Sequence, residues 1–240
     1  MNSAEDRLLV SFPFGCNMDC VFCLRNKHPQ RASFDLSAEE WKPLFEKLRA
    51  LMRVMRKRGV RILCLGGDEP TVAPAWLLAS VMALGVKEGF RKMELMSNAY
   101  RLRDRAYVGR LAAAGVNMFS LPVYGHTAAA HDAVTQKKGS YAALLRAIKN
   151  IRALPRTALK MHTVPIKANQ AKIGETVSSM RGLGLNCEIW EFRRKDTDTQ
   201  VDYRQMAVEG VKPLLQRKVD SGKKKEGSFV RYNIATGEIY

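Results

Sequence analysis

Apolar and amphipathic stretches alternate along this chain, and the alternation occurs six times. The apolar runs cover residues 8–12, 60–65, 93–96, 116–123, 158–166 and 185–192. Each run is short and rich in aliphatic residues, as strands are, whereas the stretches between them repeat apolar positions at helical spacing. Strands that alternate with helices in this way predict a parallel sheet with right-handed crossover connections.

Residues that commonly begin or end helices mark the boundaries of these amphipathic stretches. Ser37 and Glu40 have the spacing of a capping box, which predicts a long helix that reaches Lys57 and stops at Gly59. The other expected helices run from Pro74 to Gly89, from Asp104 to Gly115, from Ser140 to Leu154, from Asn169 to Gly182 and from Val201 to Asp220. Pro74 suits the first helical position of its helix, and Ser140 suits the N-cap of the helix that it begins. Six strand–helix units fall short of a complete barrel, so we predict an α/β fold with a partial (β/α)6 barrel of parallel strands. A doubly wound open sheet satisfies the same periodicity.

The 240 residues are enough for one domain with a sizeable core. We expect the core domain to span residues 1–220, and residues 221–240 to form a basic linker and a C-terminal tail. The tail begins with a charged run of lysines and then has a strand-like stretch from Phe229 to Ile234. No apolar run reaches the length of about 18 residues that spans a membrane, and the first residues lack the apolar segment of a secretory signal. We therefore expect a cytoplasmic protein without a membrane partner.

The chain is strongly basic, with 40 Lys and Arg against 23 Asp and Glu and a net charge of +17. Such a balance favours an anionic partner. A nucleic acid, an acidic peptide and a phosphorylated metabolite all satisfy it, so charge alone does not choose among them. Aromatic residues are sparse among the basic ones, which argues against a surface that stacks single-stranded nucleic acid.

Three of the five cysteines, Cys16, Cys20 and Cys23, lie within eight residues. In a reducing compartment, clustered cysteines point to metal or redox chemistry and not to disulfides. Three thiolates can hold an iron–sulfur cluster and leave one iron without a protein ligand. Together with His28, they can also form a structural zinc site of the Cys3His type. The cysteines alone leave both interpretations open.

Two further features accompany the cysteines: Phe22 directly before the third one, and Gly66-Gly67-Asp68-Glu69-Pro70 after the second apolar run. The combination resembles the radical SAM superfamily, whose signature is C-x3-C-x2-C with an aromatic residue before the last cysteine, followed by a Gly-Gly-Glu-Pro motif. The resemblance covers residues 8–192 and implies a partial barrel of six strand–helix units. Cys64 and Cys187 are too few for a cysteine-rich extension with auxiliary clusters, and we interpret them as buried core thiols.

The resemblance implies that the three clustered cysteines hold a 4Fe-4S cluster and that S-adenosylmethionine (SAM) binds its open iron. The expected cofactor-binding residues are Phe22, Gly66, Gly67, Asp68, Glu69, Ser97, Asn98 and Ser120. In the superfamily the glycine–acid turn binds the amino group of SAM, and we favour Glu69 over Asp68 for this role because Glu69 precedes Pro70. The polar pair that ends the third run lies where members contact the carboxylate and ribose. Two glycines before two acids also form ordinary turns and helix caps.

The resemblance also implies an activity. A radical SAM enzyme reductively cleaves SAM at the cluster to a 5′-deoxyadenosyl radical, which abstracts hydrogen from a substrate. We expect the substrate to be a peptide or protein side chain in a maturation reaction, a post-translational modification, because an open barrel admits a large substrate. One alternative is the same chemistry on a small anionic metabolite or nucleotide. Another is a zinc-stabilised basic RNA-binding module. The enzyme would need an electron donor such as flavodoxin or ferredoxin.

Basic residues accumulate where a substrate would enter the barrel. The most suggestive group, Arg193, Arg194 and Lys195, follows the sixth apolar run. Such a group can bind a carboxylate or phosphate through charge-assisted hydrogen bonds, although it is equally consistent with ordinary loop charges. Further basic residues follow the first and fourth runs, at Arg25, Lys27, Arg31, Lys137 and Lys138. We interpret the histidines of the fourth unit, His126 and His131, as structural. The fifth strand offers His162, and we assign no catalytic side chain.

Overall fold

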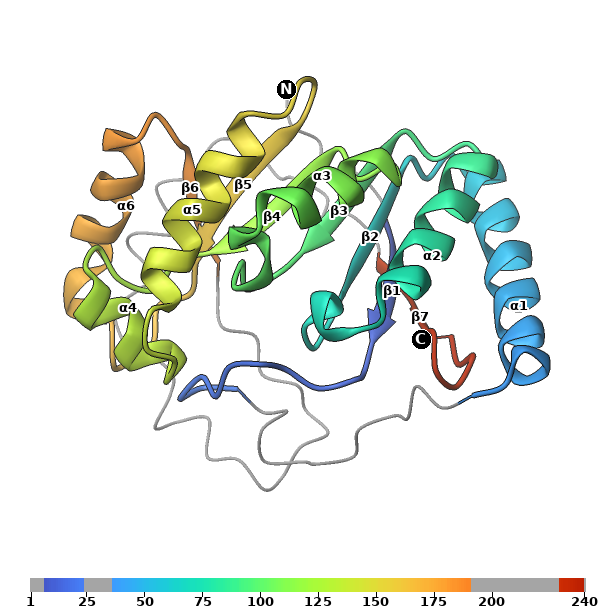
Figure 1. Ribbon diagram of the computed structural model, residues 1–240, viewed down its shortest axis with the longest axis horizontal. Coiled ribbons are helices and arrows are strands. Elements are labelled where there is room, and N and C mark those ends of the chain that lie inside the picture. Colours follow the sequence, from blue (N-terminus) through green and yellow to red (C-terminus); the bar gives the residue numbers. More distant parts are fainter. Residues whose placement is uncertain (1–6, 24–35, 191–228, 240) are drawn as a thin grey trace.

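A single parallel sheet forms the centre of the computed structural model, which describes residues 7–23, 36–190 and 229–239. Its strands are β1 (Arg7–Phe12), β2 (Ile62–Gly67), β3 (Lys92–Met96), β4 (Met118–Pro122), β5 (Ala158–Thr163), β6 (Cys187–Ile189) and β7 (Phe229–Asn233). Their order is β6-β5-β4-β3-β2-β1-β7, and all neighbours pair in parallel. The first six strands therefore follow chain order, and the seventh is added beside β1 (Figure 1).

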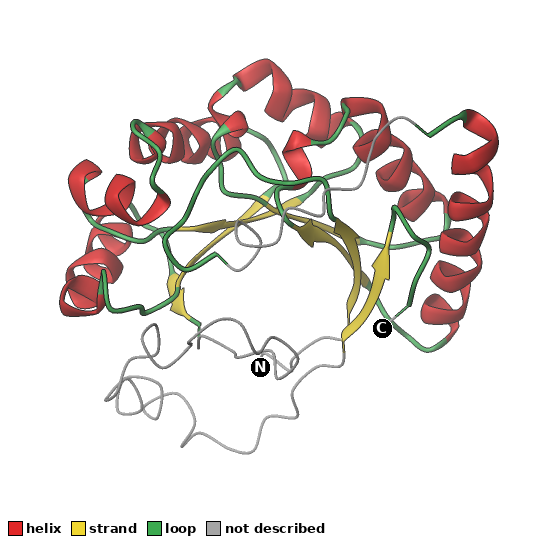
Figure 2. Ribbon diagram, turned by 90° about the horizontal axis from the view of Figure 1, so that it is seen from below, coloured by secondary structure: helices red, strands yellow, loops and turns green. Residues whose placement is uncertain are grey.

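Helices cover one face of this sheet. They are α1 (Ala38–Lys57), α2 (Ala75–Lys87), α3 (Arg105–Ala113), α4 (Ala128–Thr135), α5 (Ser140–Arg152) and α6 (Ile173–Gly182), with short 3-10 helices at Pro70–Val72, Arg101–Arg103 and Gln170–Lys172. Figure 2 shows the strands as an arc and the described helices outside it, so that none of those helices lies on the concave face. This arrangement confirms the predicted partial barrel of parallel strands. In the described ranges, no helix is both long and apolar enough to cross a membrane.

The alternation of side chains along β1 explains how the two faces differ. Leu8, Val10 and Phe12 are fully buried in the large core between the sheet and the helices. Leu9 and Ser11 therefore point to the concave face, because successive strand residues face opposite sides. The predicted buried thiols are confirmed, since Cys64 in β2 is 0% exposed and Cys187 in β6 is 6% exposed.

The sequence signals at the helix ends are largely confirmed. Ser37 is the N-cap of α1, where its hydroxyl accepts from Glu40 N at 3.3 Å and the Glu40 carboxylate accepts from Ser37 N at 2.7 Å. Asp104 caps α3 by accepting from Tyr107 N at 3.1 Å. Pro74 is the N-cap of α2 and not its first residue. The expected helix at 201–220 lies outside the described residues.

The region between β4 and α5 differs from the expectation. It contains an additional helix, α4, which the sequence analysis did not predict. Ser140 does not cap α5, because it is the first helical residue and Gly139 occupies the N-cap without a side chain. The capping acceptor is instead Asp132 in α4, which accepts from Gly139 N at 2.6 Å and Tyr141 N at 2.8 Å.

The C-terminal strand joins the main sheet. The strand-like stretch is confirmed as β7, whose Tyr232 is 0% exposed and donates its hydroxyl hydrogen to the Leu44 carbonyl in α1. Ile234, just after β7, is also fully buried in the core. The predicted boundary at residue 220 lies in the undescribed range, while residues 229–233 pair with β1 in the same sheet as the other strands.

Candidate cofactor-binding site

The cysteines lie on the segment that leaves β1, residues 13–23, called the cysteine loop below. Hydrogen bonds join this loop to the turn that follows β2. Asp68 N donates to Phe12 O and Glu69 N donates to Gly15 O, both at 3.2 Å, while Gly15 N donates to Asp68 Oδ2 at 2.9 Å. Because parallel strands end at the same edge of a sheet, chain order alone brings the two motifs together. Asp68 thereby positions the start of the cysteine loop.

The three clustered thiols are free and partly buried. Burial raises the pKa of Cys16 to about 11 and that of Cys20 to about 12, and the neighbouring thiols contribute to both rises. The three sulfur atoms are therefore close enough to influence one another. Thiols bind metals as thiolates, so a bound iron–sulfur centre would displace these protons. Within the described ranges, no three His, Cys, Asp or Glu side chains are arranged to hold a single ion.

Glu69 is the most enclosed acid of the site, with only 1% of its surface exposed. Its Oε1 accepts from Thr71 N at 3.1 Å, Thr71 Oγ1 at 2.5 Å and Ser97 Oγ at 2.7 Å. Its Oε2 accepts from Asn98 N at 2.6 Å. Burial raises the pKa of this carboxyl group, and the four hydrogen bonds oppose the rise because they favour the ionised form.

Asn98 connects this acid to the cysteine loop. Its backbone donates to Glu69, and its side-chain Nδ2 donates to Asn17 Oδ1 at 2.7 Å and lies 3.4 Å from Cys16 Sγ. The ends of β1, β2 and β3 therefore meet in one polar cluster, as the sequence predicted. Asn17 was missed, although a polar amide between two candidate ligands was a visible signal.

The two glycines of the motif have different surroundings. Gly67 has φ +107°, and an added Cβ would lie 2.7 Å from both Phe12 N and Ser11 Oγ. Gly66 has ordinary backbone angles, and a Cβ there would lie 3.0 Å from Leu9 Cδ1. The close approach at Gly67 is therefore to the end of β1, and it brings the glycine–acid turn against the cysteine loop.

Phe22 and Ser120 lie on the side of the site near β4. Phe22 packs edge-on against Tyr124 with 5.1 Å between ring centroids. Ser120 is fully buried, its carbonyl accepts from Ser97 N at 3.2 Å, and its Oγ lies 3.4 Å from His162 Nδ1. The backbone of Ser120 is thus linked to Ser97, while the side chain of Ser120 faces His162 near the end of β5.

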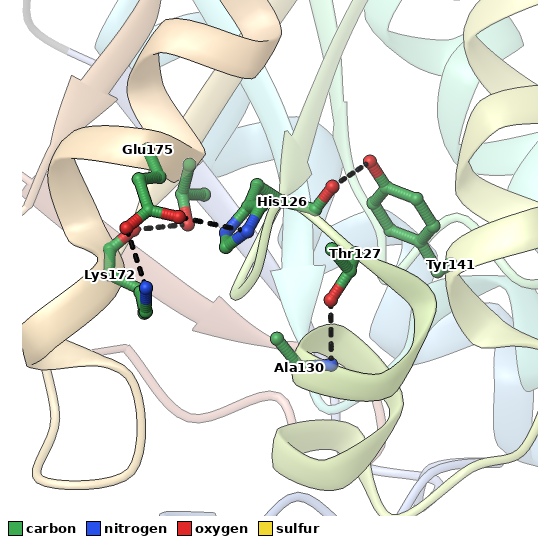
Figure 3. A network of polar contacts seen from close by, with 7 residues as sticks. His126, Thr127, Ala130, Tyr141, Lys172 and Glu175 are labelled. Carbon is green, nitrogen blue, oxygen red and sulfur yellow. Dashed lines mark hydrogen bonds and ion pairs between the residues drawn. The ribbon is translucent and has the colours of Figure 1, made fainter.

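The two histidines that follow β4 both have partners within the fold. His131 is buried and its Nδ1 accepts from Tyr124 N at 3.2 Å. His126 pairs with Glu175 of α6 at 3.0 Å, and Figure 3 shows this pair beside Lys172. Arg193, Arg194 and Lys195, and the basic residues Arg25, Lys27 and Arg31, lie outside the described residues. The role of these basic side chains stays a prediction.

The sequence profile of the radical SAM superfamily matches residues 10–179, which is more than half of the chain. The chain belongs to the radical SAM superfamily. The recognised resemblance is therefore confirmed, and so are the superfamily's cofactors, a 4Fe-4S cluster and SAM. The zinc-stabilised RNA-binding module is displaced as an explanation of the cysteines. Three free cysteines on one loop provide the sulfur donors that such a cluster requires, so the residues present fit it.

Several curated radical SAM enzymes are similar to this chain. GTP 3′,8-cyclase of Synechococcus elongatus is 31% identical over 189 residues, which are 77% of this chain and 54% of the cyclase. Mycofactocin maturase MftC of Mycobacterium tuberculosis is 27% identical over 192 residues, which are 78% of this chain and 45% of the maturase. The chain spans about half the length of these relatives.

Solved radical SAM structures share the fold. The structure of anSMEcpe with bound AdoMet superposes with a TM-score of 0.59 and 14% identity, covering 84% of this chain and 55% of that one. HemN of Escherichia coli, a coproporphyrinogen III oxidase, has a TM-score of 0.55 and 17% identity, covering 91% of this chain and 52% of that one. At these identities the likeness concerns the fold alone.

Proposed function

We propose that this radical SAM enzyme abstracts a hydrogen atom from a peptide or protein side chain in a maturation reaction. The observation that carries the proposal is the meeting of the cysteine loop, Glu69 and Asn98 at one edge of a barrel whose concave face no described helix covers. A site at such an edge is reached from the open side, which suits a large substrate. Similarity to a mycofactocin maturase supports the same class.

The residues of the cluster have separate tasks in this proposal. Cys16, Cys20 and Cys23 hold the cluster. When bound, the cluster and SAM together supply the 5′-deoxyadenosyl radical that starts the reaction. Glu69 provides a fixed negative charge for the amino group of SAM. Asn98 contacts both Glu69 and Cys16 and so fixes their positions relative to each other.

The hydrogen bonds of Glu69 indicate which of its two carboxylate oxygens would bind the amino group of SAM. A carboxylate has about four acceptor positions, shared between its two oxygens. Oε1 already accepts three hydrogen bonds, whereas Oε2 accepts one from Asn98. Oε2 is therefore the atom with room for one ammonium hydrogen. Because Ser97 uses its hydroxyl on Glu69, we assign it to supporting this carboxylate and not to direct contact with the ribose.

The opposite wall of the site is formed by the ends of β4 to β6. There His162 lies 3.4 Å from Ser120 Oγ through its Nδ1 and stacks on Trp190, which follows β6. We propose that this wall excludes water from the reacting atoms, because radicals are quenched by stray hydrogen donors. A flavodoxin or ferredoxin would supply the electron, and a cytoplasmic location fits thiols that must stay reduced.

A second candidate substrate is a small anionic metabolite or nucleotide. The net charge of +17 and the 31% identity to a GTP 3′,8-cyclase favour it. Both candidates share the same initial hydrogen abstraction, and they differ in the size of the molecule that loses the hydrogen.

Deuterium transfer from a labelled extract separates the two candidates. The cluster-loaded enzyme is incubated with SAM, a reductant and a uniformly deuterated cell extract that ultrafiltration has divided into macromolecular and small-molecule fractions. We expect deuterium to enter 5′-deoxyadenosine with the macromolecular fraction only, and protease treatment to abolish the transfer. Transfer from the small-molecule fraction alone would refute the peptide proposal and favour the nucleotide. No cleavage of SAM in either fraction would refute the reaction itself.

A further inference from the structure

The C-terminal end of α4 makes unusual use of its carbonyl groups. The last four carbonyls of a helix have no partners within the helix. Here the carbonyl of Asp132 accepts from Thr135 Oγ1 at 3.3 Å, and that of Ala133 accepts from Gln136 Nε2 at 2.5 Å. Side chains at the helix end therefore satisfy two of the four groups.

The cysteine loop satisfies the other two. Val21 N donates to the Val134 carbonyl at 3.0 Å, and Asp19 N donates to the Thr135 carbonyl at 3.2 Å. Val21 directly follows Cys20, and Asp19 directly precedes it. Two backbone hydrogen bonds thus fix the middle of the cysteine loop to the end of α4.

Apolar contacts reinforce this attachment. Phe22 packs against a small cluster of buried residues that includes Tyr124, Val134 and Ile166. The Tyr124 ring lies 5.1 Å from that of Phe22 and 5.8 Å from that of His131. The residue before Cys23 is therefore packed between the end of β4 and the last turn of α4.

Asp132 holds α4 in place from the other side. Its carboxylate accepts from Gly139 N at 2.6 Å, Ser140 Oγ at 2.7 Å and Tyr141 N at 2.8 Å. Ser140 Oγ also lies 2.7 Å from Thr135 Oγ1. One side chain therefore caps the start of α5 and joins it to α4.

The start of α4 is attached as well, as Figure 3 shows. Thr127 Oγ1 accepts from Ala130 N at 3.2 Å, and the His126 carbonyl accepts from Tyr141 Oη at 2.9 Å. His126 Nε2 in turn pairs with Glu175 in α6 at 3.0 Å. The helix is thus bound at both ends to elements that pack on the sheet.

We infer that α4, fastened by Asp132, is a support that holds the cysteine loop in position before any cluster binds, with Asp132 as a positioning residue. This inference rests on the proposed role of the cysteines as cluster ligands. Its consequence is that the loop does not have to be ordered by iron. Ordering a backbone costs free energy, so a preformed loop retains its cluster longer than a loosely held one.

Hydrogen exchange of the Asp19 and Val21 amides tests the support in the protein without a cluster. We expect both amides to be protected in the unsubstituted protein. Asp132→Ala should speed their exchange at least tenfold, whereas Asp132→Asn, which keeps one acceptor oxygen, should have a smaller effect. Asp104→Ala is the matched control, because Asp104 accepts a hydrogen bond at the start of α3, away from the loop. Unchanged protection in Asp132→Ala, or equal loss in Asp104→Ala, would overturn the inference.

Release of iron from the cluster-loaded protein tests the functional link. With a chelator present under anaerobic conditions, we expect Asp132→Ala to lose iron several times faster than Asp104→Ala, and Asp132→Asn to be intermediate. Faster amide exchange together with unchanged iron loss would show that the loop is supported but does not hold the cluster through this region. That outcome counts against the functional link between α4 and the cluster. The proposed function is tested separately, because full iron content after replacing Cys16, Cys20 or Cys23 by Ala would count against it.

Discussion

The imidazole of His162 lies flat against the indole of Trp190, with 3.7 Å between ring centroids and 6° between the planes. Trp190 N also donates to the Thr163 carbonyl at 2.8 Å, so the end of β5 holds the residue that follows β6. Burial lowers the pKa of His162 to about 4, which keeps the ring neutral near pH 7. The stacked pair therefore joins β5 to the residue after β6 without adding a charge.

The first prediction concerns acid stability. Between about pH 6.5 and pH 4 the unfolded chain protonates His162 and the folded chain does not, so stability falls as the pH falls. A shift to about 4 corresponds to roughly 3 kcal/mol lost across this window. His162→Phe keeps a ring against Trp190 and removes the proton, so its urea unfolding should depend less on pH. His131, whose pKa burial also lowers to about 4, should supply the remaining acid sensitivity. An unchanged pH profile in His162→Phe would contradict the prediction.

The second prediction tests the three candidate ligands. Replacing Cys16, Cys20 or Cys23 by Ala should reduce the iron bound after anaerobic reconstitution from about four atoms per chain to nearly none. The matched controls are Cys64→Ala and Cys187→Ala, because both thiols are buried in strands away from the cysteine loop. Iron analysis and the visible spectrum provide the measurement. Full iron content in any of the three variants would remove that cysteine from the ligand set.

The third prediction compares two glycines. Gly67→Ala should cost at least about 2 kcal/mol, because alanine disfavours its positive φ and the new Cβ would meet the end of β1. Gly109→Ala, within α3 and with nothing inside 4 Å of the added carbon, should gain about 0.5–1 kcal/mol. Urea denaturation measures both changes. A stabilised Gly67→Ala protein would show that the turn does not need this backbone conformation.

Much of the sheet could be predicted from the sequence because each strand carries its own local signal. The runs around Leu8 and Leu63 are short and almost wholly apolar, and the run around Leu95 is interrupted only by Glu94, so each reads as a buried strand. The capping pair Ser37 and Glu40 equally marks α1 without tertiary information. The contact between the cysteine loop and the glycine–acid turn could also be predicted, since consecutive parallel strands end at one edge of the sheet.

What the sequence did not reveal depends on contacts between distant residues. The helix α4 is short, and two of its last four carbonyls are satisfied by the remote residues Asp19 and Val21, so its local cap at Thr127 is only part of what holds it. The capping of α5 by Asp132 likewise replaces the local cap expected at Ser140. The pairing of β7 with β1 brings together the two ends of the described chain, which no periodicity encodes.

The fourth prediction concerns how much β7 contributes to the stability of the fold. Tyr232→Ala should cost about 3–5 kcal/mol, since it removes a fully buried aromatic ring. Tyr232→Phe should cost about 1 kcal/mol, because it removes only the hydrogen bond to Leu44 O. The exposed Ile239, also near the end, provides the control, and Ile239→Ala should stay within about 0.5 kcal/mol. If Tyr232→Ala unfolds at the same urea concentration as the control, β7 is dispensable.

The last prediction decides between the two adjacent acids. Glu69 sits among four donors, while Asp68 Oδ2 accepts from the Gly15 amide of the cysteine loop. Glu69→Gln replaces an acceptor by an NH2 group that faces donors, so we expect a loss of about 1–3 kcal/mol and at least tenfold weaker SAM binding. Asp68→Asn keeps one acceptor oxygen for Gly15 and should change SAM affinity only slightly.

Calorimetric titration of SAM into the cluster-loaded variants gives the affinities, and urea denaturation of the same proteins gives their stabilities. The two measurements together separate binding from folding. Ser97→Ala is the matched control, because it deprives Glu69 of one donor without changing its charge. It should therefore lower stability more than it lowers affinity. If Asp68→Asn weakens SAM binding tenfold while Glu69→Gln leaves it intact, the amino group is bound by Asp68, and the donors around Glu69 serve the fold alone.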